Sequence, residues 1–137
     1  MSRATATQRG QVSILVLGLA LLLFAVAGVA VDGTRAFLFR RSLQNAADGS
    51  ALAGAGEVDV DAYYSSAGQE VILEPLAARR AALNWLAGRA LSAQAAVAAD
   101  TKGLRVSVRG RIDTSFLALI GLRSIDVSAE AQAEPLD

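Results

Sequence analysis

The feature that most limits how this chain can fold is an unbroken uncharged segment, residues 12–31. At 1.5 Å per residue, a helix of this length extends about 30 Å, the thickness of the hydrocarbon core of a bilayer. Thirteen of the residues are Val, Ile, Leu or Phe, which together favour membrane insertion by about 5 kcal/mol. A chain of 137 residues has too little protein to surround a helix that is apolar on every face. The sequence therefore predicts one transmembrane helix over residues 12–31.

A cleaved secretory signal is the main alternative to an anchor. Arg3 and Arg9 precede the apolar segment, and Ala27 completes an Ala-x-Ala pattern before Gly28, as at a signal-peptidase site. Cleavage near Ala27 would release the rest of the chain as an exported binding module. The apolar run continues to Val31, however, and is longer than the roughly 7 to 15 residues of an ordinary signal. Anchoring is therefore the preferred prediction.

Positive charge does not decide the orientation of the span, because Arg residues stand on both flanks. They are Arg3 and Arg9 before the span and Arg35, Arg40 and Arg41 after it. A short N-terminal tail cannot fold by itself, and most of the chain follows the span. We therefore expect residues 1–11 to form a cytoplasmic tail and residues 32–137 to form an extracytoplasmic domain.

The residues just after the span predict that the membrane helix continues outward. Residues 36–55 are rich in helix formers and contain no Pro. Asp32 and Arg35 are three positions apart, a spacing that allows them to pair on one helix face. Arg35, Arg40 and Arg41 could also contact lipid phosphates. An ordinary solvated helix face is the alternative for all four charges.

A second helix is predicted from Pro75 to about Leu91, since Pro suits the first helical position and Glu74 before it favours the positive end of the helix dipole. Its expected apolar face consists of Leu76, Leu83, Leu86 and Ala90. Trp85 is the one large aromatic anchor and is interpreted as a core residue.

The last third of the chain predicts two half-buried strands, because apolar and polar residues alternate in segments 104–109 and 125–133. Residues 93–99 form either a linker or a weak strand. Between the two strands, residues 114–122 are strongly apolar yet too short to cross a bilayer, which indicates a packed helical turn or, second, a surface that touches a partner or a membrane. The fold class is therefore α+β: a long N-terminal helix that leaves the membrane, then a second helix packed on a small antiparallel sheet.

Three acidic residues, Glu57, Asp59 and Asp61, alternate with valines, which predicts a short strand or an extended loop. They also resemble the opening of an EF-hand calcium loop. Ala62 stands where the turn Gly belongs, and no Glu closes the loop, so calcium binding is disfavoured.

Composition excludes most enzyme classes. The chain contains no His and no Cys, which removes zinc sites, thiolate nucleophiles and the usual proton carrier. A Ser–Lys dyad would need Lys102, because it is the one Lys in the sequence. The 13 basic and 13 acidic residues cancel, so no net field attracts nucleic acid. We expect a non-enzymatic protein with no cofactor, metal, nucleic acid or small-molecule substrate.

Three short motifs surround the apolar segment: Arg-Gly before it, Val-Asp leaving it, and Leu-Gln-x-Ala-Ala-Asp followed by Ala-Leu-Ala. They comprise Arg9, Gly10, Val31, Asp32, Leu43, Gln44, Ala46, Ala47, Asp48, Ala51, Leu52 and Ala53. Together they resemble the TadE/TadG-like proteins of the tight-adherence (Tad, or Flp) pilus assembly system. The later LEPLAARRAALNWLAG segment and terminal strands resemble the actinobacterial branch.

The resemblance implies a pilin-like or pseudopilin-like accessory of pilus or related secretion-system assembly. Such a protein would lie in the bacterial cytoplasmic membrane with its domain outward, among membrane lipid and other pilus-assembly or pilin-like subunits. Family members of the prepilin type are cut after a Gly and carry Glu at the fifth position beyond it. Possible processing here would fall between Gly10 and Gln11, but the fifth residue is Leu15. The preferred expectation is therefore a permanently anchored assembly factor.

Overall fold

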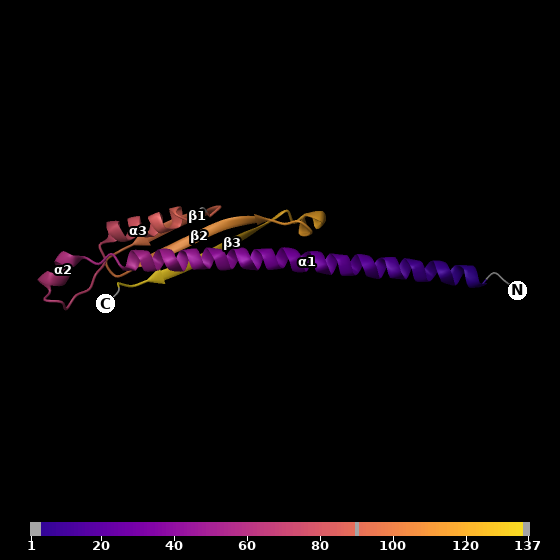
Figure 1. Cartoon of the computed structure of the whole chain (residues 1–137), viewed down its shortest axis with the longest axis horizontal. Helices are drawn as coiled ribbons and strands as arrows, with labels where there is room; N and C mark the ends of the chain where they lie inside the picture. The colour runs from indigo at the N-terminus through magenta and orange to yellow at the C-terminus, as the bar shows by residue number, and fades with distance from the viewer. Residues whose placement is uncertain (1–3, 90, 136–137) are drawn as a thin grey trace. The chain divides into compact units, whose positions relative to one another are not determined.

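The computed structural model describes residues 4–89 and 91–135. Its elements, in chain order, are the helices α1 (Ala4–Ala55), α2 (Val60–Ser65) and α3 (Pro75–Ala87), the strands β1 (Ala93–Ala99) and β2 (Leu104–Asp113), the 3-10 helix η1 (Leu117–Ile120) and the strand β3 (Ser124–Ala133) (Figure 1). The predicted α+β class is confirmed.

The contacts within the chain divide it into two units. The first combines the chain up to Arg35 with Asp113–Ser124, and the second combines Ala36–Ile112 with the chain from Ile125 onward. Helix α1 runs through both units, so the predicted continuation of the helix beyond residue 31 is confirmed. Its sequence contains no Pro, the residue that most often ends or kinks a helix.

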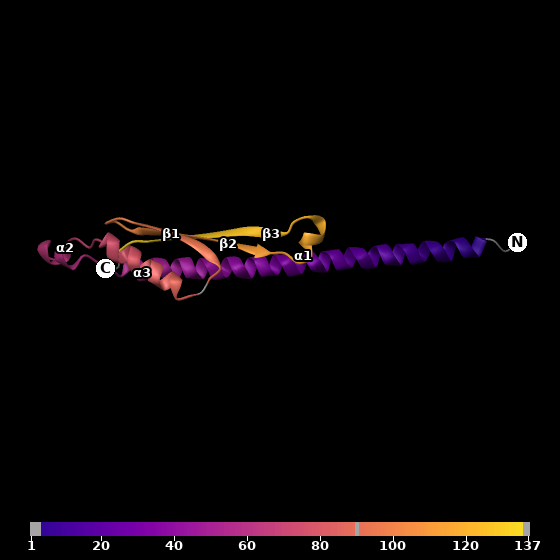
Figure 2. The same ribbon diagram turned by 90° about the horizontal axis from the view of Figure 1, so that it is seen from above.

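The second unit is built around a three-stranded antiparallel sheet in the order β1-β2-β3. Strand β1 pairs with β2 from Ala93 opposite Gly110 to Ala99 opposite Leu104. Residues 93–99 are therefore a strand rather than a linker. The second half of α1 lies along one face of this sheet, with α3 beside it (Figures 1 and 2).

The core of the second unit forms where these elements meet. It consists mainly of small or β-branched side chains: Leu43, Ala47, Ala51, Ala55, Leu73, Ala78, Ala82, Leu104, Val106, Val108, Val127, Ala129 and Ala131. The inward residues of β2 and β3 alternate with exposed polar ones. Both half-buried strands predicted from alternation are thus confirmed.

Small residues allow α1 to approach its neighbours closely. A Cβ added at Gly54 would lie 2.7 Å from a methyl of Leu104 and 2.9 Å from the backbone oxygen of Ala78. Buried Ser50 donates a hydrogen bond of 3.0 Å to the carbonyl of Ala82 in α3. The alanine-rich and glycine-rich end of α1 is therefore a packing face.

This close approach explains why the predicted face of α3 is wrong. Ala78 and Ala82, one helical turn apart, are the buried residues of α3, whereas Leu76 and Leu83 are exposed. Helices that approach closely have room for Ala between them but not for Leu. Leu86 does pack against the core, and Ala90 lies outside the described residues.

Trp85 and the end of α3 also differ from the prediction. The helix ends at Ala87, before the expected Leu91, with Gly88 at its C-cap. The Trp85 side chain is 40% exposed and is not a core residue. It covers Gly49, where an added Cβ would lie 2.7 Å from the indole nitrogen, and the Arg89 guanidinium lies 4.7 Å from the ring centroid.

The acidic segment after α1 is only partly extended. Val58 forms an isolated bridge with Leu73, but α2 begins at Val60, so the expected strand or loop is wrong from that residue. The Asp59 carboxylate accepts a hydrogen bond of 3.0 Å from the Ala62 N–H. Asp59 is therefore an N-cap, a role that the alternating pattern did not indicate.

Candidate membrane anchor and juxtamembrane clamp

The first half of α1 is long and apolar enough to cross a membrane. Only 6% of its most apolar stretch is buried, and large side chains from Val12 to Val31 are about half exposed or more. In water this would leave an apolar surface far larger than soluble proteins tolerate. The exposed helix is therefore a candidate membrane anchor.

Asp32 ends this apolar stretch and clamps the segment between β2 and β3. Its carboxylate accepts hydrogen bonds from three successive backbone N–H groups: Ser115 at 2.9 Å, Phe116 at 2.8 Å and Leu117 at 2.8 Å. These N–H groups belong to the start of η1, where they lack partners in the helix itself. Only 2% of Asp32 is exposed, so one buried carboxylate holds the loop onto α1. We call this arrangement the Asp32 clamp.

The hydrogen bonds of the clamp stabilise the charged form of Asp32. Those from Leu117 and Ser115 lower the pKa of the Asp32 carboxyl most, burial acts against them, and Phe116 and nearby Arg35 lower it further. A carboxylate that accepts several backbone N–H groups is expected to stay ionised well into the acidic range. The folded structure therefore favours the ionised form of Asp32.

Arg35 joins the clamp instead of pairing with Asp32. Its guanidinium Nη1 donates a hydrogen bond of 2.9 Å to Ser115 Oγ. Arg40 and Arg41 lie further along α1 with exposed side chains. Their contact with lipid phosphates stays a prediction.

An aromatic contact holds the same loop on the N-terminal side of Asp32. The Phe116 ring packs on buried Gly28, where an added Cβ would lie 2.6 Å from the ring. It also meets Phe24 edge-on, with ring centroids 6.0 Å apart. Since Phe24, Gly28 and Asp32 recur every four residues, they form one stripe on α1 that receives the loop.

The sequence indicated the members of the clamp but not their pairing. Asp32 is notable as an acid directly after an apolar span, and residues 114–122 are notable for their apolarity. They are separated by 83 to 85 positions, and no local pattern reports so distant a contact. The apolar segment forms a helical turn, η1, as the first interpretation expected. Phe116 packs on α1, whereas Leu119, Ile120 and Leu122 are exposed.

The possible processing site lies within α1. Gly10 and Gln11 are both helical and exposed, and no atom outside the local helix lies within 4 Å of a Cβ added at Gly10. Whether the bond between them is cut stays a prediction.

Several of the remaining motif residues serve the packing of the second unit. Leu43, Ala46, Ala47 and Ala51 are buried. Gln44 donates one hydrogen bond to Asp48 and another to the Glu130 carbonyl, at 2.9 and 3.0 Å. The Leu-Gln-x-Ala-Ala-Asp segment thus attaches α1 to strand β3.

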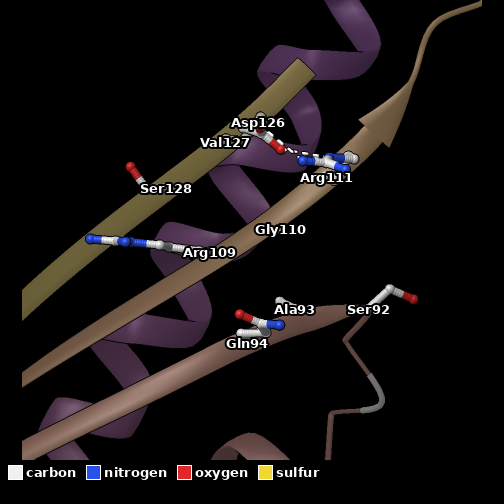
Figure 3. A pocket seen from close by; sticks show the side chains of 9 residues that line it. All are labelled: Ser92, Ala93, Gln94, Arg109, Gly110, Arg111, Asp126, Val127 and Ser128. Carbon is white, nitrogen blue, oxygen red and sulfur yellow. Dashed lines mark hydrogen bonds and ion pairs between the residues drawn. The ribbon is translucent and has the colours of Figure 1, made fainter. Parts of the chain in front are cut away.

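The outer face of the sheet carries a shallow, open hollow (Figure 3). Arg109 and Arg111 of β2 line it with Asp126 of β3, and Arg111 forms a salt bridge of 2.7 Å with Asp126. This contact lowers the pKa of the Asp126 carboxyl. Both side chains are largely solvent-exposed, so the pair adds little stability.

Within the described ranges, no group of three or more acidic side chains is placed to hold a metal ion.

Fold and site together define a small α+β protein whose one long helix is both a candidate membrane anchor and part of the core of a folded unit. Residues 10–57 match the model of a family described as Tad, putative Flp pilus-assembly TadE/G-like. The resemblance found in the motifs is thereby confirmed over about a third of the chain, while the actinobacterial type stays a prediction. No match was found among curated proteins or solved structures.

Proposed function

We propose that this chain is a non-catalytic, pseudopilin-like accessory of Tad (Flp) pilus or related secretion-system assembly. It is anchored by residues 12–31 in the bacterial cytoplasmic membrane. Residues 1–11 lie in the cytoplasm, and residues 32–137 form the extracytoplasmic domain. Its partners are membrane lipid and other pilus-assembly or pilin-like subunits.

The observation that carries this proposal is the Tad-type match over residues 10–57, which covers both the apolar helix and the Ala-rich face of α1. The match supports a role in pilus assembly, and the bare first half of α1 supports anchoring. The absence of His and Cys from the whole sequence supports a structural rather than a catalytic role.

Release by a signal peptidase near Ala27 is the second candidate. Its product would keep Gly28 and Asp32 but lose Phe24, which packs against Phe116. It would also cut inside a continuous helix. Both features favour the intact anchor.

N-terminal sequencing of the cell-associated protein separates the two candidates. An anchored accessory begins at its original N-terminus, or at Gln11 if it is processed, and a released module begins at Gly28. The role itself is tested by deleting the gene in its own organism and imaging pili by electron microscopy. We expect piliation to be lost and to return with the wild-type gene. Normal pili in the deletion strain would contradict the proposed role.

A further inference from the structure

The 3-10 turn held by the Asp32 clamp presents an apolar tip. Leu119 is 83% exposed, Ile120 73% and Leu122 56%. The exposed fractions of Leu119 and Ile120 exceed that of Val16 in the apolar segment, which is 57%, and the exposed fraction of Leu122 is similar to it. From Thr114 to Leu122 the loop has no charged residue, and Asp113 and Arg123 flank it. Solvent-exposed turns in soluble domains are usually polar, so this tip calls for an apolar surrounding.

The tip is fixed beside the part of α1 that would lie in lipid. Its Phe116 ring packs on Gly28 and Phe24. Phe24 precedes Val31, the last residue of the uncharged run, by seven positions, or about 10 Å along a helix axis. If residues 12–31 span the bilayer, the Phe116 ring lies inside the hydrocarbon on the outer side.

Most backbone N–H groups of the tip form hydrogen bonds within the protein, as a medium without water requires. Asp32 accepts the N–H groups of Ser115, Phe116 and Leu117. Those of Leu119, Gly121 and Leu122 bond to carbonyls within the tip, and that of Thr114 bonds to Arg123. The Thr114 hydroxyl donates to the Leu122 carbonyl. Seven backbone N–H groups from Thr114 to Leu122 thus have partners within the protein, which lowers the free-energy cost of placing this irregular backbone in hydrocarbon.

Glycine makes the tight closure of the tip possible. Gly121 has a φ of +97°, a left-handed conformation that residues with a Cβ rarely adopt. Its N–H bonds to the Ala118 carbonyl at 3.1 Å. The turn can therefore close on itself and leave the Leu119 and Ile120 side chains pointing outward.

We infer that residues 116–122 form a second membrane contact, a tip that dips into the outer leaflet of the bilayer alongside α1. The occupant of this apolar surface is lipid, because the tip continues the apolar surface of the span to which it is fixed. The domain is thus attached to the membrane at two points of the sequence that lie about 90 residues apart. This inference rests on the proposed anchoring of the chain.

Fluorescence quenching in vesicles tests the inference. The chain has no Cys, so an environment-sensitive nitrobenzoxadiazole dye can be placed on a single introduced Cys in the full-length protein. The test variants are Ile120→Cys and Leu119→Cys, both at exposed side chains. Val16→Cys in the span and Tyr64→Cys in α2, which is 76% exposed, are the lipid and water controls. The protein is reconstituted in vesicles of phosphatidylethanolamine and phosphatidylglycerol.

We expect spin-labelled lipid to quench the dye at positions 119 and 120 as it does at position 16, and aqueous iodide to quench it only at position 64. Iodide quenching at both tip positions, with lipid quenching at position 16, would overturn the inference and leave the anchor intact. Quenching at the tip by neither agent would mean a protein cover and would also overturn it. Iodide quenching at position 16 would refute the anchor itself.

Discussion

The Asp32 carboxylate accepts hydrogen bonds from three backbone N–H groups, more than any other side chain in the described residues. Hydrogen bonds to a charged acceptor are stronger than those to a neutral one. Removing the charge but keeping the shape should therefore loosen the loop without unfolding the second unit, whose core does not include this residue.

The Asp32→Asn substitution tests this expectation. Each lost or weakened hydrogen bond should lower local protection by about fivefold to tenfold. Amide hydrogen exchange of the full-length protein in detergent micelles should thus be faster at Ser115, Phe116 and Leu117, and unchanged at Val106 and Val108. Asp48→Asn, also on α1 but with an exposed side chain, is the matched control. Unchanged exchange at the three loop amides would refute the clamp.

The clamp also predicts a specific response to acid. The folded pKa of Asp32 is lowered, so its contribution is fully present above the unfolded aspartate value of about 3.9 and is lost as the pH falls through the lower folded value. The amide NMR shifts of Phe116 and Leu117 should stay constant from neutral pH to about pH 4 and change only below it. A titration midpoint above that value, or the same curve in Asp32→Asn, would contradict the assignment.

Single residues were harder to place from sequence than elements. Asp32 directly follows the apolar segment in the sequence, but its hydrogen-bond partners lie more than 80 positions away. Large apolar residues usually occupy a core, which predicts Leu76 and Trp85 there. In this molecule α3 instead buries Ala78 and Ala82, which lie close to Gly54 and Ser50 of α1. Trp85 lies over Gly49 and stays partly exposed.

At the scale of elements, the contact of α1 with α3 and the sheet depends on the absence of side chains at Gly54. Replacing Gly54 by Val would force new atoms against Leu104 and the Ala78 backbone. Overpacking of this kind costs about 1–3 kcal/mol. Denaturant unfolding followed by Trp85 fluorescence should show the lower free energy of unfolding.

Gly56→Ala is the control for this substitution. A Cβ at Gly56 would lie 3.7 Å from the Ala53 carbonyl oxygen, an ordinary contact. Its unfolding midpoint should stay close to that of the wild type. If Gly54→Val unfolds at the wild-type midpoint as well, the close packing of α1 described above is wrong.

The alternation of apolar and polar residues predicted the strands well where one face of the sheet is buried and the other is exposed. The alternation in β2 and β3 matched their inward and outward faces, and the lack of Pro correctly indicated that α1 continues beyond the apolar segment. The Ala-rich segment 93–99 was ambiguous, because its small residues give no contrast between faces. It became a strand through pairing with β2, which is a tertiary effect.

At the scale of the whole molecule, the account depends on lipid as the solvent for the first half of α1. A charge at the centre of a transmembrane helix costs about 3 kcal/mol. Leu22→Arg should therefore lower the fraction of protein found in membranes, measured by immunoblot after fractionation, whereas Leu22→Ala should not. Equal retention of all three proteins would count against this segment as the anchor.

The most direct test of the central claim is protease accessibility of the full-length protein in intact spheroplasts, combined with an alkaline wash of the membranes. We predict that the protein resists the wash and that external protease removes residues beyond Asp32 while an N-terminal fragment stays protected. Uncut protein recovered freely dissolved in the cytosol would contradict the claim.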